Sequence, residues 1–510
     1  MHGAEKGTLQ QALSMAQEAV KLDTAKDSHG AVRAYIQSIK TLDTVIQRLT
    51  SSSQPDELQR VTSIRDTYIE RVKLLSQRYS IPNEFNPQKS SSMASTNLQL
   101  HEVPVADRPP TPWLRRLKAI QFILIFDLGC LLNNACHFML LPIRILPFRC
   151  TRGLYDEGIR YTKGAFGCLL ILACQWFAPT TLSITFEEQG QGRLTKDEID
   201  QIVSRDESGK VIGLKLPKKS VLIANHQMYA DWWYAWCLAY FMDAQKDVFI
   251  VLKKSLKWLP IVGWGMQFFR FIFLARSWAS DRVALARQLS RLGKQAQEED
   301  KPFLFLLYPE GTLVSKDTRP ISKKFAEKQG ISDMKHTLLP RSTGLHHSLR
   351  SLVPRIPRLK LIDATVVYPG IPPMGYGQTY YTLRSIFMNG VPPPVIHIHL
   401  RVFDVGEEVP IGDLSSSNPS ALPNLSSSKK IVETDIPEAE KTEFDLWLRN
   451  LWREKDLMFD AYHSAKRFAS GGTTAPVEIP VRLRSSREVW DAFCFFLPVV
   501  LVTYVWRRFV

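Results

Sequence analysis

Apolar residues recur at three- and four-residue intervals through the first part of the chain, the spacing of one face of an α-helix. Charged residues occupy the positions between them, and turn residues interrupt the pattern at Gly30 and again at Ser51–Pro55. The apolar stripes run over Leu9–Leu22, Val32–Leu49 and Leu58–Leu75. Three amphipathic helices joined by short turns can close one small core. The pattern therefore predicts an all-α, antiparallel three-helix bundle over residues 1–82.

Residues 113–184 are the most apolar region of the first half of the chain. The run Ala119–Leu141 is long enough to cross a bilayer, and a second run, Ala165–Phe177, is shorter. Polar side chains, which are costly in lipid, lie inside the first run at Asp127, Asn133, Asn134 and His137. Basic residues flank this run on both sides, so they select no orientation. We expect a membrane-associated helical region, with a leaflet-embedded hairpin, a spanning pair and buried core helices as alternatives.

From residue 185 to residue 410, short apolar runs alternate with helical patterns, which is typical of an α/β domain with a mostly parallel central sheet. The predicted strands are Val221–Ala224, Val248–Leu252, Phe271–Leu274, Pro302–Leu307, Leu361–Val367 and Val395–Val402. Polar segments rich in Ser and Pro precede and follow these regions, and we expect a flexible linker over 83–112 and a flexible loop over 411–434. An amphipathic helix is predicted over 435–470. The apolar run 488–508 is short for a membrane span and is predicted to be a C-terminal membrane segment.

The formal net charge of +15 suits either nucleic acid or an anionic membrane surface. The sequence contains no glycine–aromatic RNA signature, zinc-ligand spacing or basic recognition helix, so we expect no nucleic-acid partner and no metal site. The chain has twelve Trp residues, several of them in apolar helices, which favours a membrane interface. Its seven Cys residues show no paired spacing and indicate a reducing, cytosol-facing protein. The polar, charged N-terminus indicates no cleavable signal peptide.

The stretch Val221–Trp233 carries the first candidate for chemistry. An apolar strand ends at Asn225 and His226, and Asp231 follows where a helical pattern begins. A carboxylate that holds one imidazole nitrogen leaves the other free to take a proton from a hydroxyl at neutral pH. The alternative is structural: His226 as a satisfied buried group, with Asp231 as a helix N-cap.

Further polar residues follow the other predicted strands. Arg276 follows the third strand, Glu310-Gly311-Thr312 follows the fourth, and Pro369-Gly370 follows the fifth. Ligands of open α/β sheets bind at the carboxyl ends of the strands, so His226, Arg276 and Glu310 are predicted to converge on one crevice. An arginine beside glycine-containing backbone suits a phosphate group.

In order along the chain these blocks read NHQMYAD, FIFLAR, YPEGT and ATVVYPG. They resemble the four motifs of the glycerophospholipid (lysophosphatidic-acid-type) acyltransferase family. The stretches LKKSLKWLPIVGWGMQ, HTLLPRSTG and FDLWLRNLWREKD are similar to the subgroup that acts on lysocardiolipin and lysophosphatidylinositol. The resemblance covers roughly residues 113–470.

This resemblance implies an acyl-CoA-dependent lysophospholipid acyltransferase of phospholipid remodelling, with acyl-CoA as co-substrate and no cofactor. His226 is implied as general base and Asp231 as the residue that orients it. Lys253 is a candidate to stabilise the oxyanion; the alternative is a membrane-facing or solvated lysine. The implied substrate-binding residues are Asn225, Arg276, Glu310, Gly311, Thr312, Arg341 and Pro369. For Arg341, phosphate binding and capping of the sheet both remain open.

The text ALSMAQEAVKLDTAKDSHGAVRAYIQSIKTL near the N-terminus resembles the MIT (microtubule-interacting and trafficking) domain. The acyltransferase family does not normally carry such a domain. The resemblance implies binding to amphipathic tail helices of ESCRT-type subunits. We expect a location on endoplasmic reticulum or endosomal membranes, with the active site and the bundle facing the cytosol. The alternatives are a trafficking adaptor with an inactive acyltransferase domain, and a lysophosphatidic acid acyltransferase of de novo synthesis.

Overall fold

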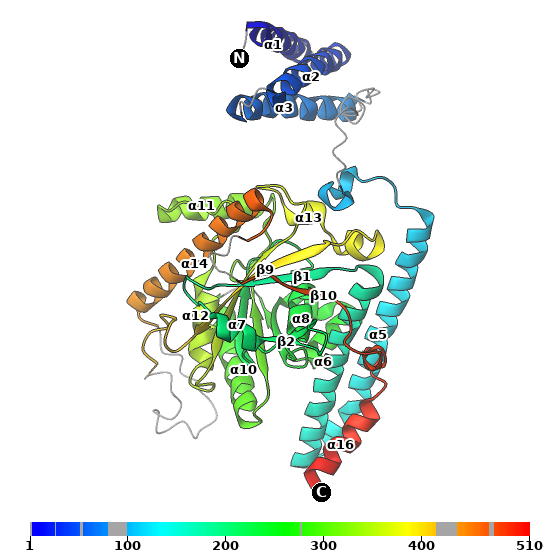
Figure 1. Cartoon of the computed structure of the whole chain (residues 1–510), viewed down its shortest axis with the longest axis vertical. Coiled ribbons are helices and arrows are strands. Elements are labelled where there is room, and N and C mark those ends of the chain that lie inside the picture. Colours follow the sequence, from blue (N-terminus) through cyan, green and yellow to red (C-terminus); the bar gives the residue numbers. More distant parts are fainter. Residues whose placement is uncertain are drawn as a thin grey trace. The chain divides into compact units, whose positions relative to one another are not determined.

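The structure is a computed structural model that describes residues 3–25, 27–51, 55–79, 99–275, 278–414, 436–468 and 474–509. The chain divides into two compact units, Met1–Leu98 and Gln99–Val510 (Figure 1). The described ranges leave out almost all of the predicted loop 411–434 and the first part of the predicted linker.

The first unit contains three helices, α1 (Gly3–Thr24), α2 (Ser28–Ser51) and α3 (Pro55–Tyr79). Their apolar stripes meet in two small buried clusters, one around Ala19, Tyr35 and Val72 and the other around Ala12 and Val61. These are the stripes that the sequence pattern predicts, and burying them against one another removes their apolar area from water.

The second unit is built on an eight-stranded mixed sheet with the strand order β10-β1-β9-β8-β4-β7-β5-β6. Five neighbouring strands, from β8 to β6, are mutually parallel, whereas β9 and β10 each run antiparallel to a neighbour. The strands are β1 (Thr181–Phe186), β4 (Lys219–Ala224), β5 (Val248–Lys253), β6 (Ile272–Leu274), β7 (Phe303–Leu307), β8 (Lys360–Val367), β9 (Val395–Asp404) and β10 (Val477–Pro480). A separate hairpin pairs β2 (Val203–Arg205) with β3 (Val211–Leu214).

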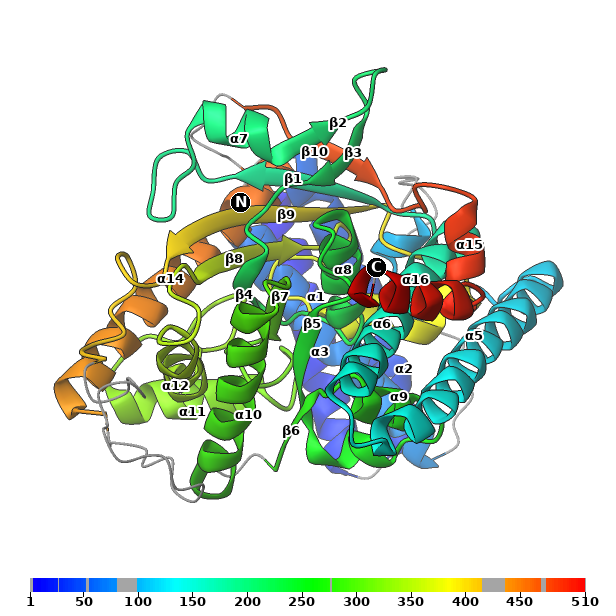
Figure 2. The same cartoon turned by 90° about the horizontal axis from the view of Figure 1, so that it is seen from below.

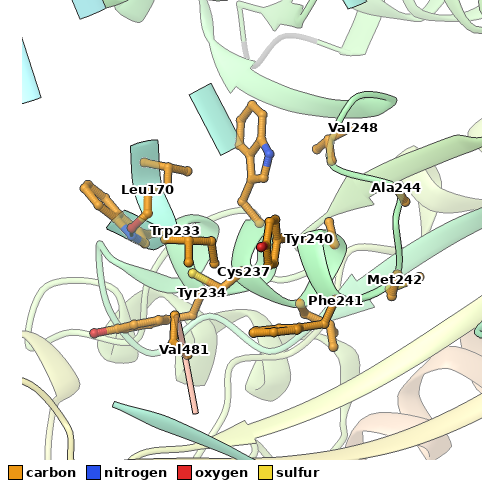
Figure 3. Packing of buried hydrophobic residues seen from close by; sticks show 14 of the residues in the cluster. Leu170, Trp233, Tyr234, Cys237, Tyr240, Phe241, Met242, Ala244, Val248 and Val481 are labelled. Atoms are coloured by element: carbon orange, nitrogen blue, oxygen red, sulfur yellow. Dashed lines mark hydrogen bonds between the residues drawn. The ribbon is translucent and has the colours of Figure 1, made fainter. Parts of the chain in front are cut away.

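Helices cover both faces of the sheet (Figures 1 and 2). Leu222 and Ala224 of β4 belong to one apolar cluster with residues of α6 and α8, whereas Val221 and Ile223 belong to a second with residues of α10, α12 and α14. Figure 3 shows part of the first cluster, where Trp233 also donates a hydrogen bond to the carbonyl of Leu170. The α-helices are α5 (Trp113–Ile145), α6 (Arg149–Phe177), α7 (Lys196–Ile202), α8 (Asp231–Phe241), α9 (Val262–Phe268), α10 (Trp278–Glu298), α11 (Arg319–Gln329), α12 (Ser342–Leu352), α13 (Gly377–Tyr380), α14 (Glu438–Ala465), α15 (Arg487–Asp491) and α16 (Leu497–Phe509). Single turns η1 (Leu100–Glu102), η2 (Val105–Asp107), η3 (Lys254–Trp258) and η4 (Arg384–Met388) complete the fold.

All six predicted strands are present, but the sheet extends beyond both predicted boundaries of the α/β domain. Strand β1 begins at Thr181, inside the segment predicted to be helical, and β10 is contributed by residues far downstream. The prediction missed β1 because its apolar residues follow those of α6 almost without interruption. It missed β10 because four residues give too short a pattern to distinguish a strand.

The prediction of a flexible linker over 83–112 is wrong for residues 99–112. These residues form η1 and η2 and pack against the rest of the second unit, to which they belong. Arg108 donates a 2.6 Å hydrogen bond to the carbonyl of Tyr380, and a Cβ atom on Gly370 would lie 2.6 Å from the carbonyl oxygen of His101. The polar composition that suggested a linker here supplies hydrogen bonds to the neighbouring backbone.

Helix α5 buries Asn133, Asn134 and His137 and exposes most of its large apolar side chains, whereas Asp127 is exposed. Asn133 and His137 hydrogen-bond to Thr162 of α6, and Asn134 donates to the carbonyl of Ile261. The opposite face exposes large apolar side chains along the whole helix: Trp113, Leu114, Leu117, Ile120, Ile123, Leu124, Leu128, Leu131, Leu132, Phe138, Met139 and Ile145. Helix α16, which packs against α6, also exposes apolar residues. Within the described residues, α5 alone is long and apolar enough to cross a membrane.

Candidate active site

His226 and Asp231 form a hydrogen-bonded pair at the carboxyl end of β4. The chain leaves the sheet at Ala224, turns through six residues and enters α8 at Asp231. Nδ1 of His226 lies 2.7 Å from Oδ2 of Asp231. Because that contact occupies Nδ1, the nitrogen that remains to exchange a proton is Nε2. The pair therefore has the geometry of a carboxylate-oriented general base.

The carboxylate of Asp231 is held by four donors. Its Oδ2 atom also accepts hydrogen bonds from the backbone N–H groups of Gln227 and Met228, at 2.7 and 3.0 Å. Its Oδ1 atom accepts a 2.7 Å hydrogen bond from the hydroxyl of Tyr368. The N-cap residue of α8 is Ala230, and the Asp231 side chain bonds backward to the turn. The N-cap alternative for Asp231 is therefore wrong, because the carboxylate satisfies turn amides and the imidazole.

The His226 ring is supported on one side by Tyr308. The two rings are stacked with centroids 4.4 Å apart, and the His226 side chain remains 20% exposed. Burial raises the pKa values of Tyr308 and Tyr368 well above the usual range, so both phenols keep their protons. A ring that is fixed in orientation and still open to solvent suits a proton acceptor for a bound substrate.

Glu310 lies close to the histidine but inside the protein. It is 2% exposed, and its carboxylate accepts hydrogen bonds from the backbone N–H groups of His226 and Leu338 and from the indole of Trp452, each at 3.2 Å. Burial raises the pKa of Glu310 to about 8, although the three N–H donors oppose this. In this structure the side chain connects three segments of the site.

Asn225 and Pro369 also make contacts within the protein. The amide of Asn225 donates to the carbonyl of Val366 at 2.9 Å and accepts from the N–H of the same residue at 2.7 Å. It thereby joins the end of β4 to β8. The carbonyl of Pro369 accepts a hydrogen bond from the hydroxyl of Tyr381.

Gly311, Thr312 and Arg341 form a more open part of the site. Gly311 has a φ of +71°, a conformation that favours glycine, and its N–H bonds to the carbonyl of Tyr308. A Cβ atom on Gly311 would lie 3.6 Å from Cδ of Arg341, which is exposed at the start of α12. The backbone N–H of Arg341 donates to the carbonyl of Pro309 at 2.8 Å. The structure therefore brings Arg341 and Gly311 together.

The two remaining predicted residues stand apart from these contacts. Lys253 is exposed at the end of β5, on the carboxyl edge of the sheet that also carries His226. Arg276 lies outside the described residues. Among the described residues, no group of three or more His, Cys, Asp or Glu side chains is arranged to hold a metal ion.

Tyr308, Tyr368 and Trp452 are site residues that the sequence analysis did not identify. Tyr308 and Tyr368 lie within the motifs YPEGT and ATVVYPG. Their positions at the ends of predicted strands could therefore have identified them as site residues. Trp452 lies about 140 residues beyond Glu310, on α14, and no local pattern links the two.

Comparisons with known proteins identify similar families and relatives. A protein-family model described as "Acyltransferase" matches residues 209–369, and the model of the MIT (microtubule interacting and transport) domain matches residues 9–77. A 2-acyl-1-lysophosphatidylinositol acyltransferase of Saccharomyces cerevisiae is 33% identical over 382 residues, which cover 69% of this chain and 86% of that protein.

Two further relatives match shorter segments. Lysocardiolipin acyltransferase 1 of Danio rerio is 34% identical over 195 residues, covering 38% of this chain and 47% of that protein. A probable 1-acyl-sn-glycerol-3-phosphate acyltransferase 5 of Arabidopsis thaliana is 29% identical over 264 residues, covering 51% and 58%.

Proposed function

Because the chain belongs to the acyltransferase family of these lysophospholipid and acylglycerol-phosphate enzymes and carries an MIT domain, we propose that it transfers an acyl chain from acyl-CoA to the hydroxyl of a lysophospholipid. The observation that carries this proposal is the His226–Asp231 pair, with Nδ1 occupied and the ring open to solvent. Lysophosphatidylinositol is the first candidate substrate, since the yeast relative is named for it.

In the proposed reaction, Nε2 of His226 takes the proton of the lysolipid hydroxyl as its oxygen attacks the thioester carbonyl of acyl-CoA. The new carbon–oxygen bond forms a tetrahedral intermediate whose negative charge needs a nearby donor or cation, and Lys253 is the proposed source. The carbon–sulfur bond then breaks, and the CoA sulfur leaves with the proton from His226. Asp231 stabilises the imidazolium between these steps.

We propose that the phosphate of the lysolipid binds at the open side of the site, at Gly311, Thr312 and Arg341, with Arg276. The guanidinium of Arg341 lies beside the left-handed turn at Gly311, a combination of cation and exposed backbone that suits an oxyanion. Glu310 and Asn225 are proposed to stabilise this surface without contacting the phosphate, because their polar atoms hydrogen-bond to the backbone of His226 and Val366.

We further propose that the exposed apolar face of α5 binds the membrane that holds the lipid substrate. Asn133, Asn134 and His137 hydrogen-bond to α6 and to the carbonyl of Ile261, so the outward face offers a bilayer mainly apolar side chains, with Asp127 the charged residue exposed within Ala119–Leu141. A location on endoplasmic reticulum or endosomal membranes with the site facing the cytosol completes the proposal, because acyl-CoA is a charged, cytosolic substrate.

The test is turnover by the purified full chain in detergent, with one acyl-CoA and three separate acceptors: lysophosphatidylinositol, monolysocardiolipin and lysophosphatidic acid. Release of the CoA thiol and formation of the diacyl product are measured together. We expect product with lysophosphatidylinositol and a loss of about 10²–10⁴-fold in His226→Ala. Preference for lysophosphatidic acid would favour the de novo synthesis alternative, which the Arabidopsis relative represents. Absence of product with every acceptor would leave the adaptor function.

A further inference from the structure

Helix α14 lies outside the residues that the acyltransferase family model matches, yet it contacts the core of the candidate site. We propose that Trp452 of α14 is a positioning residue, which fixes Glu310 and through it the backbone of the catalytic histidine. The expected effect on kinetics rests on the proposed function. The expected effect on the structure rests on the hydrogen bonds alone.

The direct connection runs through a single carboxylate oxygen. Trp452 is fully buried, and its indole N–H donates to Oε1 of Glu310 at 3.2 Å. The same oxygen accepts the backbone N–H of His226, also at 3.2 Å. Trp452 and His226 therefore share one acceptor, and a displacement of that oxygen is transmitted to the residue that carries the general base.

A second connection begins one helical turn later, at Asp456. Its carboxylate accepts the backbone N–H groups of Lys335, His336 and Thr337, at 2.5, 2.7 and 3.0 Å. The next residue, Leu338, donates its N–H to Oε2 of Glu310. The helix thus reaches both oxygens of Glu310, one through Trp452 and the other through this loop.

A buried ion pair fixes α14 against the sheet at the same level. Nζ of Lys455 lies 2.6 Å from Oδ1 of Asp363 in β8, and both side chains are fully buried. The same ammonium donates to the carbonyl of Ala364 at 2.8 Å. Separating the two side chains would leave a buried charge without its partner. The ion pair therefore fixes the position and the rotation of α14 relative to β8.

These contacts give α14 a definite effect on turnover. General-base catalysis requires the imidazole within hydrogen-bonding reach of the substrate hydroxyl, and displacements of about 1 Å cost up to 10²-fold in rate. Trp452 is therefore expected to act on kcat, whereas the open surface at Arg341 governs the binding of the lysolipid.

The test compares Trp452→Phe with Trp447→Phe on the same helix. Trp447 is a close control, because it packs against Phe403 and Phe444 and its buried indole N–H has no hydrogen-bond partner in the part of the chain that the structure describes. Both variants remove an indole from α14, but only the first removes a hydrogen bond to Glu310. Each is made in the full chain, and also combined with Glu310→Ala, which removes both acceptor oxygens.

Two readouts are used. In the first, hydrogen–deuterium exchange is measured at the amides of residues 224–230, which include the His226 N–H that bonds to Glu310. Exchange should accelerate in Trp452→Phe and remain at the wild-type rate in Trp447→Phe. This readout needs no acyltransferase activity, so it stays informative if the proposed function fails.

In the second, turnover should show a roughly tenfold lower kcat with unchanged KM values in Trp452→Phe. The loss should disappear when Glu310→Ala is already present, because both changes remove the same connection. Equal exchange in the two tryptophan variants, or a kcat loss that adds fully to that of Glu310→Ala, would overturn the proposal. A large fall in Tm with both kcat and KM disturbed would reduce Trp452 to a packing residue and overturn it as well.

Discussion

Tyr368 donates a 2.7 Å hydrogen bond to Oδ1 of Asp231, the carboxylate oxygen that faces away from His226. The other oxygen binds the imidazole and two backbone amides. Tyr368 is fully buried, and its phenol keeps its proton because burial raises its pKa. The hydroxyl therefore fixes the rotation of the carboxylate plane, and with it the angle at which Asp231 meets the histidine ring.

Tyr368→Phe should lower kcat because the carboxylate loses the donor that fixes its plane. Hydrogen bonds to charged groups contribute about 1.5–3 kcal/mol, but His226 and two amides still hold the other oxygen, so we expect a loss of roughly tenfold. The measurement is kcat and KM in detergent. Tyr381→Phe, which removes a hydroxyl bonded to the Pro369 carbonyl, is the neighbouring control. Equal effects of the two variants would show that the contact with Asp231 has no special role.

Asp231→Asn should fold normally and lose most of its activity. The amide oxygen can still accept the backbone N–H groups of Gln227 and Met228, and the amide nitrogen can donate to the Tyr368 oxygen. The neutral side chain no longer stabilises a protonated imidazole, so we expect kcat to fall by about 10²–10⁴-fold.

For this variant, kcat and Tm are measured together, with Asp200→Asn on the exposed face of α7 as control. A Tm that falls by many degrees would show that the charge of Asp231 stabilises the turn, and would disconnect the rate loss from catalysis.

The His226–Asp231 pair was predictable from sequence because strand, turn and helix succeed one another within thirteen residues. The parallel direction of β4, β7 and β8 also follows from the alternating pattern, and it places the motifs at one edge of the sheet. The role of Glu310 was not predictable, because the same motif describes a residue that points at a ligand and one that points inward. Only the three donors around its carboxylate distinguish them.

The buried face of α14 shows the same limit. Apolar periodicity identifies Phe444, Leu451 and Tyr462, and all three are buried. It cannot identify Lys455, a charged residue that is fully buried because Asp363 lies opposite it in β8. A partner distant in sequence leaves no local signal, so burial of a charge becomes visible only in three dimensions.

The pH dependence of stability should report the burial of Glu310. Burial raises its pKa in the folded chain to about 8, from 4.5. Between these values the folded state keeps a proton that the unfolded state releases, so this group contributes most stability at low pH and loses it as pH rises towards 8. Glu310→Gln has no such proton.

The Tm of wild type should therefore fall relative to that of Glu310→Gln as pH rises from 5.5 to 8.5. Thermal melting in detergent across this range is the measurement. Other titrating groups are common to both proteins and cancel in the difference. A difference that is constant with pH would show that Glu310 titrates in the folded chain near its ordinary pKa.

Membrane binding should depend on the outward face of α5. The double variant Leu124→Glu/Leu128→Glu places two charges one helical turn apart, at side chains that are 63% and 50% exposed. A charge moved into the apolar layer costs about 3 kcal/mol, so we expect a much larger carbonate-extractable fraction. The matched control is Ile321→Glu/Phe325→Glu on α11, where the same spacing joins side chains that are 61% and 51% exposed. Equal extraction of the two variants would place the membrane contact elsewhere.

The N-terminal unit should be dispensable for turnover. We expect that the chain can be shortened to about residue 98, but not much further, without loss of activity. The buried clusters of α1, α2 and α3 draw only on residues of those helices, and every contact described around His226 comes from residues of the second unit. Deletion of residues 1–98 should therefore leave kcat and KM in detergent within about twofold of the full chain. Deletion of residues 1–112 should not, because it also removes Arg108 and His101, which hold the segment from Gly370 to Tyr380 next to Tyr368.

The two truncations distinguish an N-terminal unit that acts independently of the enzyme from one that stabilises it. If the MIT domain determines where the protein is located in the cell, deletion of residues 1–98 should redistribute it among cellular membranes. The turnover measured in detergent should not change. Isolated residues 1–82 should fold alone with limited stability, as expected for a small core, and should bind an ESCRT-type tail helix weakly. Loss of turnover after deletion of residues 1–98, with a lower Tm, would show that the N-terminal unit stabilises the enzyme. Full activity in the longer deletion would show that the contacts of Arg108 and His101 do not support the site.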